Sequence, residues 1–535
     1  METSLGRLQK QVDTQSRQIV RLQDNLEHQK KEKKNAQYEL RKFKEQVEER
    51  IEKALKKQEE KLKKEYEIKL NEKDKRIFEL ECRLNINSET SSLPSSKDPI
   101  DKKKKEKIQI QNSREKTERK KGGQKGHLKS SLKKFDHSEI TEVIEHSCDE
   151  CPNCHSKNLS VIETKERDEL DTKTTIEKRR HTFLTKICNE CGHIIKSQIP
   201  NNLHGENQYG SEIKSLILML YDYGFVSYNR IKDIISGFTN NQVSPSEGYM
   251  VKLQKKAGIA LDMFVFDVAE ILKKSQLIHW DDTVVGIGEK EKACFRAYTD
   301  RSFVLFKAHM AKNITGMDED GILQNLTKNT IVVHDHLLHN YCDDYEYQNA
   351  ECNAHITRKL KGIAVNTKHS WADEMEKLLK DTLKSRKEYI DKKITSFSES
   401  ELKEIFAKYD KIVSKGFIEY KELKHKYEYT NEENLLEFLR DYKDNITFWI
   451  KDFTVPYSNN FVESLLRMIK TKMKISLNFK GLEQARYFAN IRSYTETCGN
   501  FGINKPLALK RLFEGTPYTV DELISLKNSQ LEDSI

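Results

Sequence analysis

The sequence is poor in the residues that membrane-spanning and disulfide-stabilised proteins require. Hydrophobic residues make up only 36% of its 535 residues, below the roughly 45–50% of an ordinary globular domain. No apolar run approaches the roughly 18 residues that a membrane span needs. Ten cysteines are too few for a disulfide framework in a chain of this length, and the polar N-terminus predicts no secretory signal peptide. We therefore expect an intracellular protein without a membrane partner.

The chain also lacks a large excess of one charge. Its 94 Lys and Arg stand against 85 Asp and Glu, a net charge of +9. Residues 101–134 alone contain fourteen basic and four acidic residues, a net charge of +10, so the remainder is close to neutral. At about 150 residues per domain the length predicts three or four domains, and the basic segment favours an anionic partner.

This basic segment lies in a predicted linker, residues 88–135, which opens with a Ser- and Pro-rich stretch at 91–99. Glycines in the Gly-Gly-Gln-Lys-Gly-His sequence at 122–127 would allow the backbone to approach a phosphate closely. We expect phosphate contacts from Lys120, Lys121 and Lys125. The alternative is a solvated basic linker.

Residues 1–87 contain no proline and a single glycine, and their apolar residues recur at heptad spacing. The two seam positions hold Leu5, Val12, Ile19 and Leu26, and Leu8 and Leu22. This pattern predicts a coiled coil that pairs protomers into a homodimer or higher oligomer. The heptads break near residues 28–35, which leaves a single charged helix or a partly disordered arm as the alternative.

Residues 136–200 contain two Cys-x-x-Cys pairs, Cys151 with Cys154 and Cys188 with Cys191. This spacing lets both sulfurs of a pair reach one tetrahedral Zn²⁺ at about 2.3 Å. We predict a zinc ribbon in which four cysteine ligands leave no open position, so that the ion is structural. Cys148 and His155 are near enough to substitute in the ligand set, and a redox pair is the alternative.

Residues 201–274 have the apolar spacing of helices, interrupted by Gly237 and by Asn240 and Asn241. One face is predicted to carry Ile213, Leu216, Ile217 and Leu220. A helix, a turn and a second helix in a basic context predict a DNA-reading unit. An ordinary helical spacer fits the same pattern.

From residue 275 the apolar period becomes that of strands. Strands are predicted at Leu277–Val285, Ala293–Ala297, Phe303–Ala308 and Thr330–His334, with a short helix at Met317–Leu326. Asp281 and Asp282 interrupt the first strand, and Asp335 follows the last. A buried carboxylate is costly unless it is paired or metal-bound. Acids on two adjacent strands therefore predict a shared divalent metal ion.

A third acid is expected on a helix that packs across the sheet, and Glu463 is the best candidate. Asn459 or Asn460 is predicted to cap this helix, which places Glu463 in its first turns. Cationic residues follow on the same helical face, namely Arg467, Lys470 and Lys474. Paired Mg²⁺ ions held by such carboxylates clamp the attacking and leaving oxygens in phosphoryl transfer. The alternative is a surface helix with a Glu463–Arg467 ion pair.

Histidines at 334, 336 and 339 flank Asp335, and Cys352 and His355 follow. These residue types can ligate a metal. We instead expect packing or substrate contact, because the carboxylates already account for the metal.

In this order the motifs resemble the transposases of the insertion-sequence-sixty-six family, a DDE group with an RNase H-like core. The resemblance runs from about residue 80 to 512. It is carried by the Ser- and Pro-rich stretch, the glycine motif at 122–127, both Cys-x-x-Cys pairs, Asp281-Asp282-Thr283, the Cys-x-x-His-x-x-Arg-Lys sequence at 352–359, the Asn-Asn-x-x-Glu sequence at 459–463 with Arg467, and Ile491-Arg492-Ser493-Tyr494. Asp282 stands where the family usually has Glu, and Asp335 lies in His-Asp-His rather than Asp-Gly-Tyr.

The resemblance implies a DNA transposase. Asp281, Asp335 and Glu463 would hold two Mg²⁺ (or Mn²⁺) ions, with water cleaving a phosphodiester at the end of the element and the released 3′-hydroxyl attacking target DNA. Supporting roles fall to Asp282, Cys352, His355, Asn459 and Asn460. The expected partner is double-stranded DNA, at the element ends and the target, in a bacterial cytoplasm near the nucleoid.

We expect an α+β multidomain chain. Its predicted parts are a coiled coil (1–87), a basic linker (88–135), a zinc module (136–200), a helical domain (201–274), a catalytic core in two parts (275–365 and 448–500) around a helical insertion (366–447), and a C-terminal tail (501–535). Two rival functions remain: a catalytically inactive DNA-binding or regulatory protein, and a nuclease without strand transfer.

Overall fold

The computed structural model describes residues 2–86, 134–200, 202–203, 205–423 and 430–532. Lys120, Lys121 and Lys125, and with them most of the predicted basic linker, lie outside the described residues. The described chain combines many helices with a mixed sheet, which confirms the α+β class. In the part of the chain that is described, no helix has the length and apolarity to cross a membrane.

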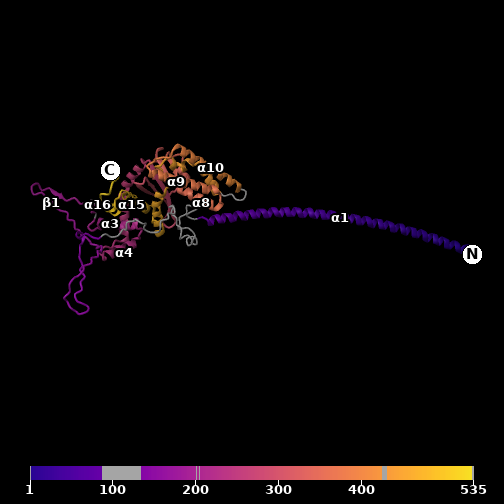
Figure 1. Ribbon diagram of the computed structural model, residues 1–535, viewed down its shortest axis with the longest axis horizontal. Coiled ribbons are helices and arrows are strands. Elements are labelled where there is room, and N and C mark those ends of the chain that lie inside the picture. Colours follow the sequence, from indigo (N-terminus) through magenta and orange to yellow (C-terminus); the bar gives the residue numbers. More distant parts are fainter. Residues whose placement is uncertain (1, 87–133, 201, 204, 424–429, 533–535) are drawn as a thin grey trace.

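The N-terminal helix α1 (Glu2–Leu84) projects from the body of the molecule (Figure 1). Its 83 residues correspond to about 125 Å at 1.5 Å per residue. Ion pairs at i,i+4 spacing, such as Glu49–Lys53, support the helix. The predicted seam residues whose exposure is described, Leu8, Val12, Ile19, Leu22 and Leu26, are exposed in the single chain. Near the end of the helix, Asn85 donates a hydrogen bond to Asn366 Oδ1 at 2.9 Å.

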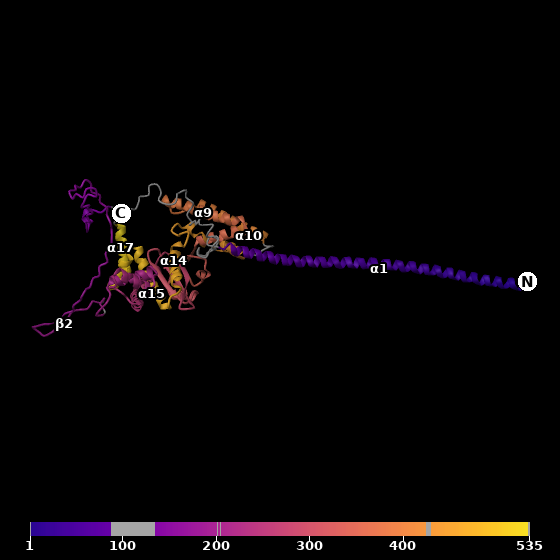
Figure 2. The same cartoon turned by 90° about the horizontal axis from the view of Figure 1, so that it is seen from below.

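The segment that holds the two Cys-x-x-Cys pairs has little regular structure. It contains the short 3₁₀ turn η2 (His137–Glu139) and a hairpin of β1 (Thr185–Ile187) and β2 (Ile194–Lys196). Figures 1 and 2 show it as extended loops that reach away from the body.

Five helical elements follow, as the sequence predicts for this region. They are α3 (Ser211–Leu218), the π-helical turn η3 (Met219–Tyr223), α4 (Tyr228–Phe238), α5 (Glu247–Ala260) and α6 (Asp262–Leu272). The predicted apolar face of α3 was partly wrong. Leu216 is 47% exposed, whereas Leu218 is buried beside Ile217.

A five-stranded sheet forms the centre of the molecule, in the order β5-β4-β3-β6-β7. The strands are β3 (Leu277–Ile287), β4 (Glu291–Thr299), β5 (Val304–His309), β6 (Ile331–His334) and β7 (Gln348–Glu351). Pairing is antiparallel among β3, β4 and β5 and parallel among β3, β6 and β7. Short connections follow β5 and β6: α7 (Ile314–Asp320), η4 (Leu323–Asn325) and η5 (Leu338–Tyr341). The four strands predicted from apolar periodicity are confirmed, and β7 was missed because its sequence is polar.

Helices cover the sheet and extend its core. Those after β7 are α8 (Asn353–Thr367), α9 (Ser370–Asp391), α10 (Glu399–Leu423), α11 (Thr430–Asp441), α12 (Lys443–Ile446) and α13 (Phe448–Lys451). Trp371 and Trp449 are buried in the apolar cluster that these helices share with Val333 of β6. The chain then returns to the sheet with α14 (Asn460–Ser476) and α15 (Leu482–Asn500) and ends with α16 (Lys505–Glu514) and α17 (Val520–Glu532).

A buried charged cluster joins η3 to α14 and α15. Asp222, Lys472 and Arg492 are each at most 3% exposed. Gln254 donates a hydrogen bond to Asp222 Oδ1 at 3.2 Å. The Lys472 ammonium lies 4.4 Å from the centre of the Tyr221 ring. Burial raises the pKa of Asp222 to about 7, against the opposing effect of Lys472. Burial likewise lowers the pKa of Lys472, so the low-polarity surroundings favour the neutral form of both partners.

The Asp222 carboxyl predicts a pH dependence of stability. Its pKa is about 7 in the folded protein against 3.8 for the free group, so the folded state binds the extra proton between these values. The free energy of unfolding should therefore rise as the pH falls from 7 towards 4, by up to about 1.4 kcal/mol per pH unit from this group. Asp222→Asn should remove that part of the slope in urea titrations. An unchanged slope would show that the carboxyl is ionised throughout this range.

Candidate active site

Asp281 and Asp335 occupy equivalent positions on adjacent parallel strands. The register pairs Leu277 with Ile331 and His279 with Val333, and the same offset carried two residues further places Asp281 opposite Asp335. Burial raises the pKa of Asp281 well above its ordinary value, and the negative charges of Asp335 and Glu463 raise it further. The charges of Asp335 and Glu463 therefore act on Asp281, although among the described residues the three acids do not form a group whose ligand atoms all lie within 4.8 Å of one another.

Glu463 reaches this position from the first turn of α14 and is only 13% exposed. Its Oε1 lies 3.8 Å from Cys352 Sγ and 3.7 Å from His355 Nδ1. Its Oε2 lies 3.8 Å from the Arg467 guanidinium. The carboxylate is thus enclosed by side chains of α8 and α14, and it has no tight hydrogen bond of its own.

The side chain of Asn459 fixes the start of α14 against β3. Of the two residues predicted to cap the helix, Asn459 is the N-cap residue, but its side chain makes no capping hydrogen bond. Its Nδ2 donates to the backbone oxygen of Trp280 at 2.8 Å, so its Oδ1 accepts from His279 Nδ1 at 2.9 Å. Burial lowers the pKa of His279 to about 4, which keeps this ring neutral. Asn460 is the exposed first residue of the helix.

Replacing Asn459 should therefore disturb both stability and the placement of Glu463. Asn459→Ala leaves the buried His279 N–H and the Trp280 carbonyl unpaired, at a cost of about 1–3 kcal/mol for each group. We expect a lower Tm and, at permissive temperature, DNA cleavage reduced by about 10²-fold through misplacement of the carboxylate.

Two variants sharpen this test. Asn459→Asp keeps the acceptor for His279 but sets an oxygen against the Trp280 carbonyl, so it should not restore activity. Ser464→Ala changes an exposed residue of the same helix and should leave the Tm nearly unchanged. Equal melting temperatures for Asn459→Ala and Ser464→Ala would contradict the bracing role.

Asp282 faces away from the three acids. Side chains alternate along a strand, and the Asp282 carboxylate pairs with Lys312 Nζ at 2.9 Å. In the register of the sheet it lies opposite Arg296 of β4, which is fully buried. The structure therefore places Asp282 behind the acidic site.

Two of the histidines beside Asp335 are held within the fold. His334 Nε2 lies 2.7 Å from Asn349 Oδ1. His336 Nδ1 lies 2.9 Å from Glu351, and its ring packs at 3.8 Å against the ring of Phe438. The packing predicted for His334 and His336 is confirmed.

The predicted cationic stripe of α14 is exposed. Arg467, Lys470 and Lys474 all face solvent. Lys472 was missed, although it continues the buried face of α14 that Val462, Leu466 and Ile469 form, because a lysine is ordinarily a surface residue. An exposed basic stripe beside an acidic site is suited to phosphate contact.

The four cysteines of the predicted zinc site come together in pairs only. Backbone N–H groups lower the pKa of Cys151, and the nearby Cys154 thiol lowers it further. Cys188 and Cys191 form the same arrangement. Among the described residues, the side chains that could jointly hold a metal ion form one group of three or more, and this group contains none of the four. Each pair therefore fits two zinc ligands, but the two pairs stand apart.

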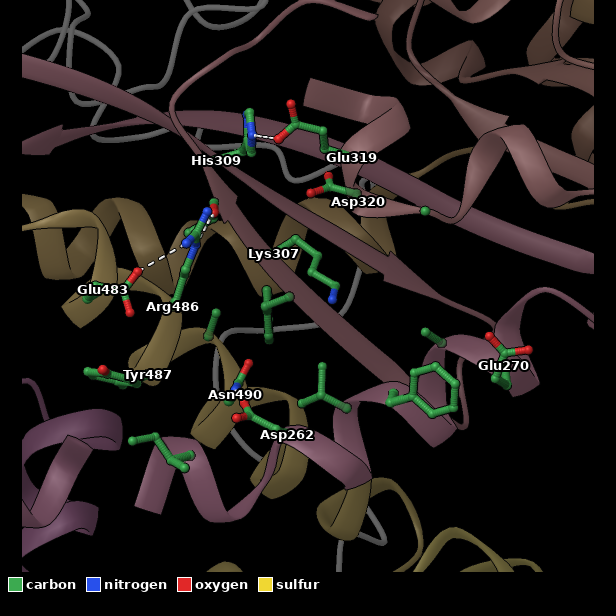
Figure 3. A pocket seen from close by; sticks show the side chains of 18 of the residues that line it. Asp262, Glu270, Lys307, His309, Glu319, Asp320, Glu483, Arg486, Tyr487 and Asn490 are labelled. Atoms are coloured by element: carbon green, nitrogen blue, oxygen red, sulfur yellow. Dashed lines mark hydrogen bonds and ion pairs between the residues drawn. The ribbon is translucent and has the colours of Figure 1, made fainter. Parts of the chain in front are cut away.

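A pocket of about 770 Å³ lies beside the sheet edge at β5, away from the three acids (Figure 3). It is lined by α6, β5, α7 and α15, and its charged groups include the ion pairs Glu483–Arg486 and His309–Glu319. Ser493 and Thr497 of α15 accept hydrogen bonds from backbone N–H groups of β5. The pocket contains none of the predicted catalytic residues.

A comparison with known protein families identifies the family of this chain. The model of the Transposase IS66 family matches residues 206–487, more than half of the chain. The chain belongs to this family. No curated protein and no solved structure matches it. The matched region of this IS66 transposase contains all three acids, whereas α1 and both Cys-x-x-Cys pairs precede it.

Family membership implies DNA binding and the use of divalent metal ions in general. Sequence reasoning named Asn459, Cys352 and His355 as supporting residues beside the three predicted acids, but not the contacts that they make. Asn459 was assigned to the wrong contact, and Cys352 and His355 were given no connection to Glu463. Trp280 and Cys352 are residue types that are often buried, and their positions beside the acids hinted at such contacts. The contacts themselves join segments more than 100 residues apart.

Proposed function

We propose that this IS66-family transposase cleaves the ends of an insertion sequence and joins them to target DNA, with Asp281, Asp335 and Glu463 as its catalytic residues. The observation that supports the proposal is the convergence of three carboxylates from β3, the end of β6 and α14. Like charges close together are unfavourable unless a cation neutralises them. An RNase H-like core in two parts, residues 275–365 and 448–500, accounts for this placement, and residues 366–447 form an insertion within it.

The three acids would hold a pair of Mg²⁺ or Mn²⁺ ions. Asp281 gives the strongest support for a bound cation. Burial and the charges of Asp335 and Glu463 raise its pKa, and a cation would stabilise its ionised form. Divalent ions bound by oxygen ligands supply Lewis-acid activation and neutralise developing charge in phosphoryl transfer. Asp281 and Asp335 approach this site from the sheet and Glu463 from the helix that Asn459 anchors.

The exposed cations of α14 give the chain its own means of holding DNA. Arg467, Lys470 and Lys474 would contact phosphates next to the acidic site and set the register of the strand to be cut. Lys120, Lys121 and Lys125 of the linker would add contacts farther along the duplex. Each neutralised phosphate makes binding more sensitive to salt.

The remaining parts are proposed to recognise the element and to pair its two ends. Residues 136–200 and the helices of 201–274 would bind the end sequence, with α4 and α5 as a helix-turn-helix unit. A structural Zn²⁺ on Cys151, Cys154, Cys188 and Cys191 requires the two cysteine pairs to meet. The exposed seam of α1 would bury its leucines in a coiled coil with a second protomer.

The proposal is tested by incubating the purified chain and Mg²⁺ with a labelled duplex that carries the element's ends. We expect nicking at the end and joining of the released 3′ end to a target plasmid, and loss of both in Glu463→Gln. Nicking without joining would instead indicate a nuclease. End binding with no nicking above the Glu463→Gln background would indicate a DNA-binding protein that has lost catalysis.

A further inference from the structure

A second group of metal-ligating side chains overlaps the acidic site. Ligand atoms of Cys352, His355 and Glu463 all lie within 4.8 Å of one another, and this is the one such group of three or more among the described residues. Cys352 and His355 come from the start of α8, and Glu463 comes from the start of α14. The set of one thiol, one imidazole and one carboxylate differs from the all-oxygen set that Mg²⁺ prefers.

The distances match those between ligands of one tetrahedral ion. Glu463 Oε1 lies 3.8 Å from Cys352 Sγ and 3.7 Å from His355 Nδ1. Zinc bond lengths of about 2.3 Å to sulfur and about 2.0 Å to nitrogen and oxygen give separations of about 3.5 Å and about 3.3 Å at tetrahedral angles. Both separations from Glu463 are therefore within a few tenths of an ångström of these values, and the sulfur and the imidazole lie within 4.8 Å of each other.

Two further features favour a ligand there. His355 Nδ1 is buried and has no hydrogen-bond partner, and such an orphaned polar atom is costly. Cys352 is fully buried, and its sulfur accepts a hydrogen bond from the backbone N–H of Asn459 at 3.2 Å. Burial and the charge of Glu463 raise the pKa of the Cys352 thiol to about 12, against the opposing effect of the backbone N–H groups of Asn459, His355 and Ala354. The case for a ligand therefore rests on the geometry of the three side chains.

We propose that Cys352, His355 and Glu463 bind Zn²⁺ or another thiolate-binding divalent cation, with a fourth position open, and that this ion inhibits DNA cleavage. Inhibition follows because Glu463 cannot serve both this ion and the pair of aspartates at once. The binding part of the proposal stands on the three side chains alone. The inhibitory part rests on the proposed function.

Binding is tested with Co²⁺, whose bonds to thiolate absorb light, on the metal-free full chain. The four knuckle cysteines are replaced together (Cys151→Ser, Cys154→Ser, Cys188→Ser, Cys191→Ser) so that they contribute no signal. We expect one equivalent of Co²⁺ with a thiolate charge-transfer band. The band should vanish in Cys352→Ser, weaken in His355→Ala and persist in Cys498→Ser, which removes a buried thiol of α15. Absence of the band, or its persistence in Cys352→Ser, overturns the site.

Should the fourfold variant fail to fold, the wild-type chain and Cys352→Ser are compared with their knuckles intact. The wild type should bind one more equivalent of Co²⁺, and equal stoichiometry overturns the site. Zn²⁺ is then titrated into the Mg²⁺ cleavage reaction. Cys352→Ser should need about ten- to a hundredfold more Zn²⁺ for half-inhibition, the usual effect of disturbing a metal site. Equal inhibition of both proteins overturns the inhibitory role, whereas a chain that never cleaves refutes the proposed function and leaves the Co²⁺ result standing.

Discussion

Asp281→Asn is expected to abolish Mg²⁺-dependent DNA cleavage and, at the same time, to raise the Tm of the metal-free protein. Both effects come from the same feature, the burial of this carboxylate together with the charges of Asp335 and Glu463. A metal site lowers the activation barrier of phosphoryl transfer by several kcal/mol. Each 1.36 kcal/mol of barrier changes the rate about tenfold. Cleavage should therefore fall by at least about 10³-fold.

The gain in stability follows from the sign of the pKa shift. The pKa of Asp281 is raised in the folded protein, so at every pH above that value the ionised group opposes folding. The cost begins to fall as the pH drops through the folded pKa and is gone below the ordinary value of 3.8. A neutral amide removes it at neutral pH. Each kcal/mol gained should appear as about 2–4 °C in Tm. Mg²⁺ should raise the Tm of the wild type and have less effect on the variant.

Asp282→Asn provides the matched comparison, because it changes the adjacent residue on the opposite face of β3. It breaks an ion pair with the half-exposed Lys312 and should not raise the Tm. A Tm gain of equal size in both variants would show that the effect is unrelated to the acidic cluster. Cleavage by Asp281→Asn at the wild-type rate would remove this residue from the catalytic set.

Most of the sheet and the positions of Asp281 and Asp335 could be predicted from local sequence patterns. Apolar alternation located β3, β4, β5 and β6, and the carboxylates stood out because apolar strands rarely contain them. β7 was not predicted, because its Gln-Asn-Ala-Glu sequence has no apolar alternation. It forms a strand because it pairs with β6.

The third acid required more than periodicity. A glutamate in the first turn of an amphipathic helix is ordinarily a surface residue. Glu463 was singled out because the two aspartates required a third acid on a helix across the sheet, and the family motif agreed with this choice. Its surroundings depended on contacts that no local pattern encodes. The Asn459 side chain bonds to residues about 180 positions away, and Lys472 is buried because Asp222 lies opposite it. Positioning groups of this kind appear only when distant segments are brought together.

Arg296→Met should be among the most destabilising single substitutions in the sheet. The Arg296 guanidinium is fully buried and bonds to Asp320 Oδ2 at 2.9 Å, to the Gly316 carbonyl at 2.9 Å and to the Ala311 carbonyl at 2.7 Å. These bonds hold α7 against the face of the sheet behind Asp281. Removing the cation leaves the buried Asp320 with Tyr298 as its remaining partner. Loss of one partner of a buried pair costs about 3–5 kcal/mol.

The measurement is the free energy of unfolding in urea, with two comparisons that separate geometry from charge. Arg296→Lys keeps the charge, but an ammonium cannot reproduce the forked contacts of a guanidinium, so we expect only partial recovery. Lys312→Met breaks the pair with Asp282, whose lysine is 51% exposed, and should cost less than about 1 kcal/mol. Equal losses for Arg296→Met and Lys312→Met would contradict the bracing of α7. A larger loss for Arg296→Met would show that the buried guanidinium braces α7 against the sheet that carries Asp281.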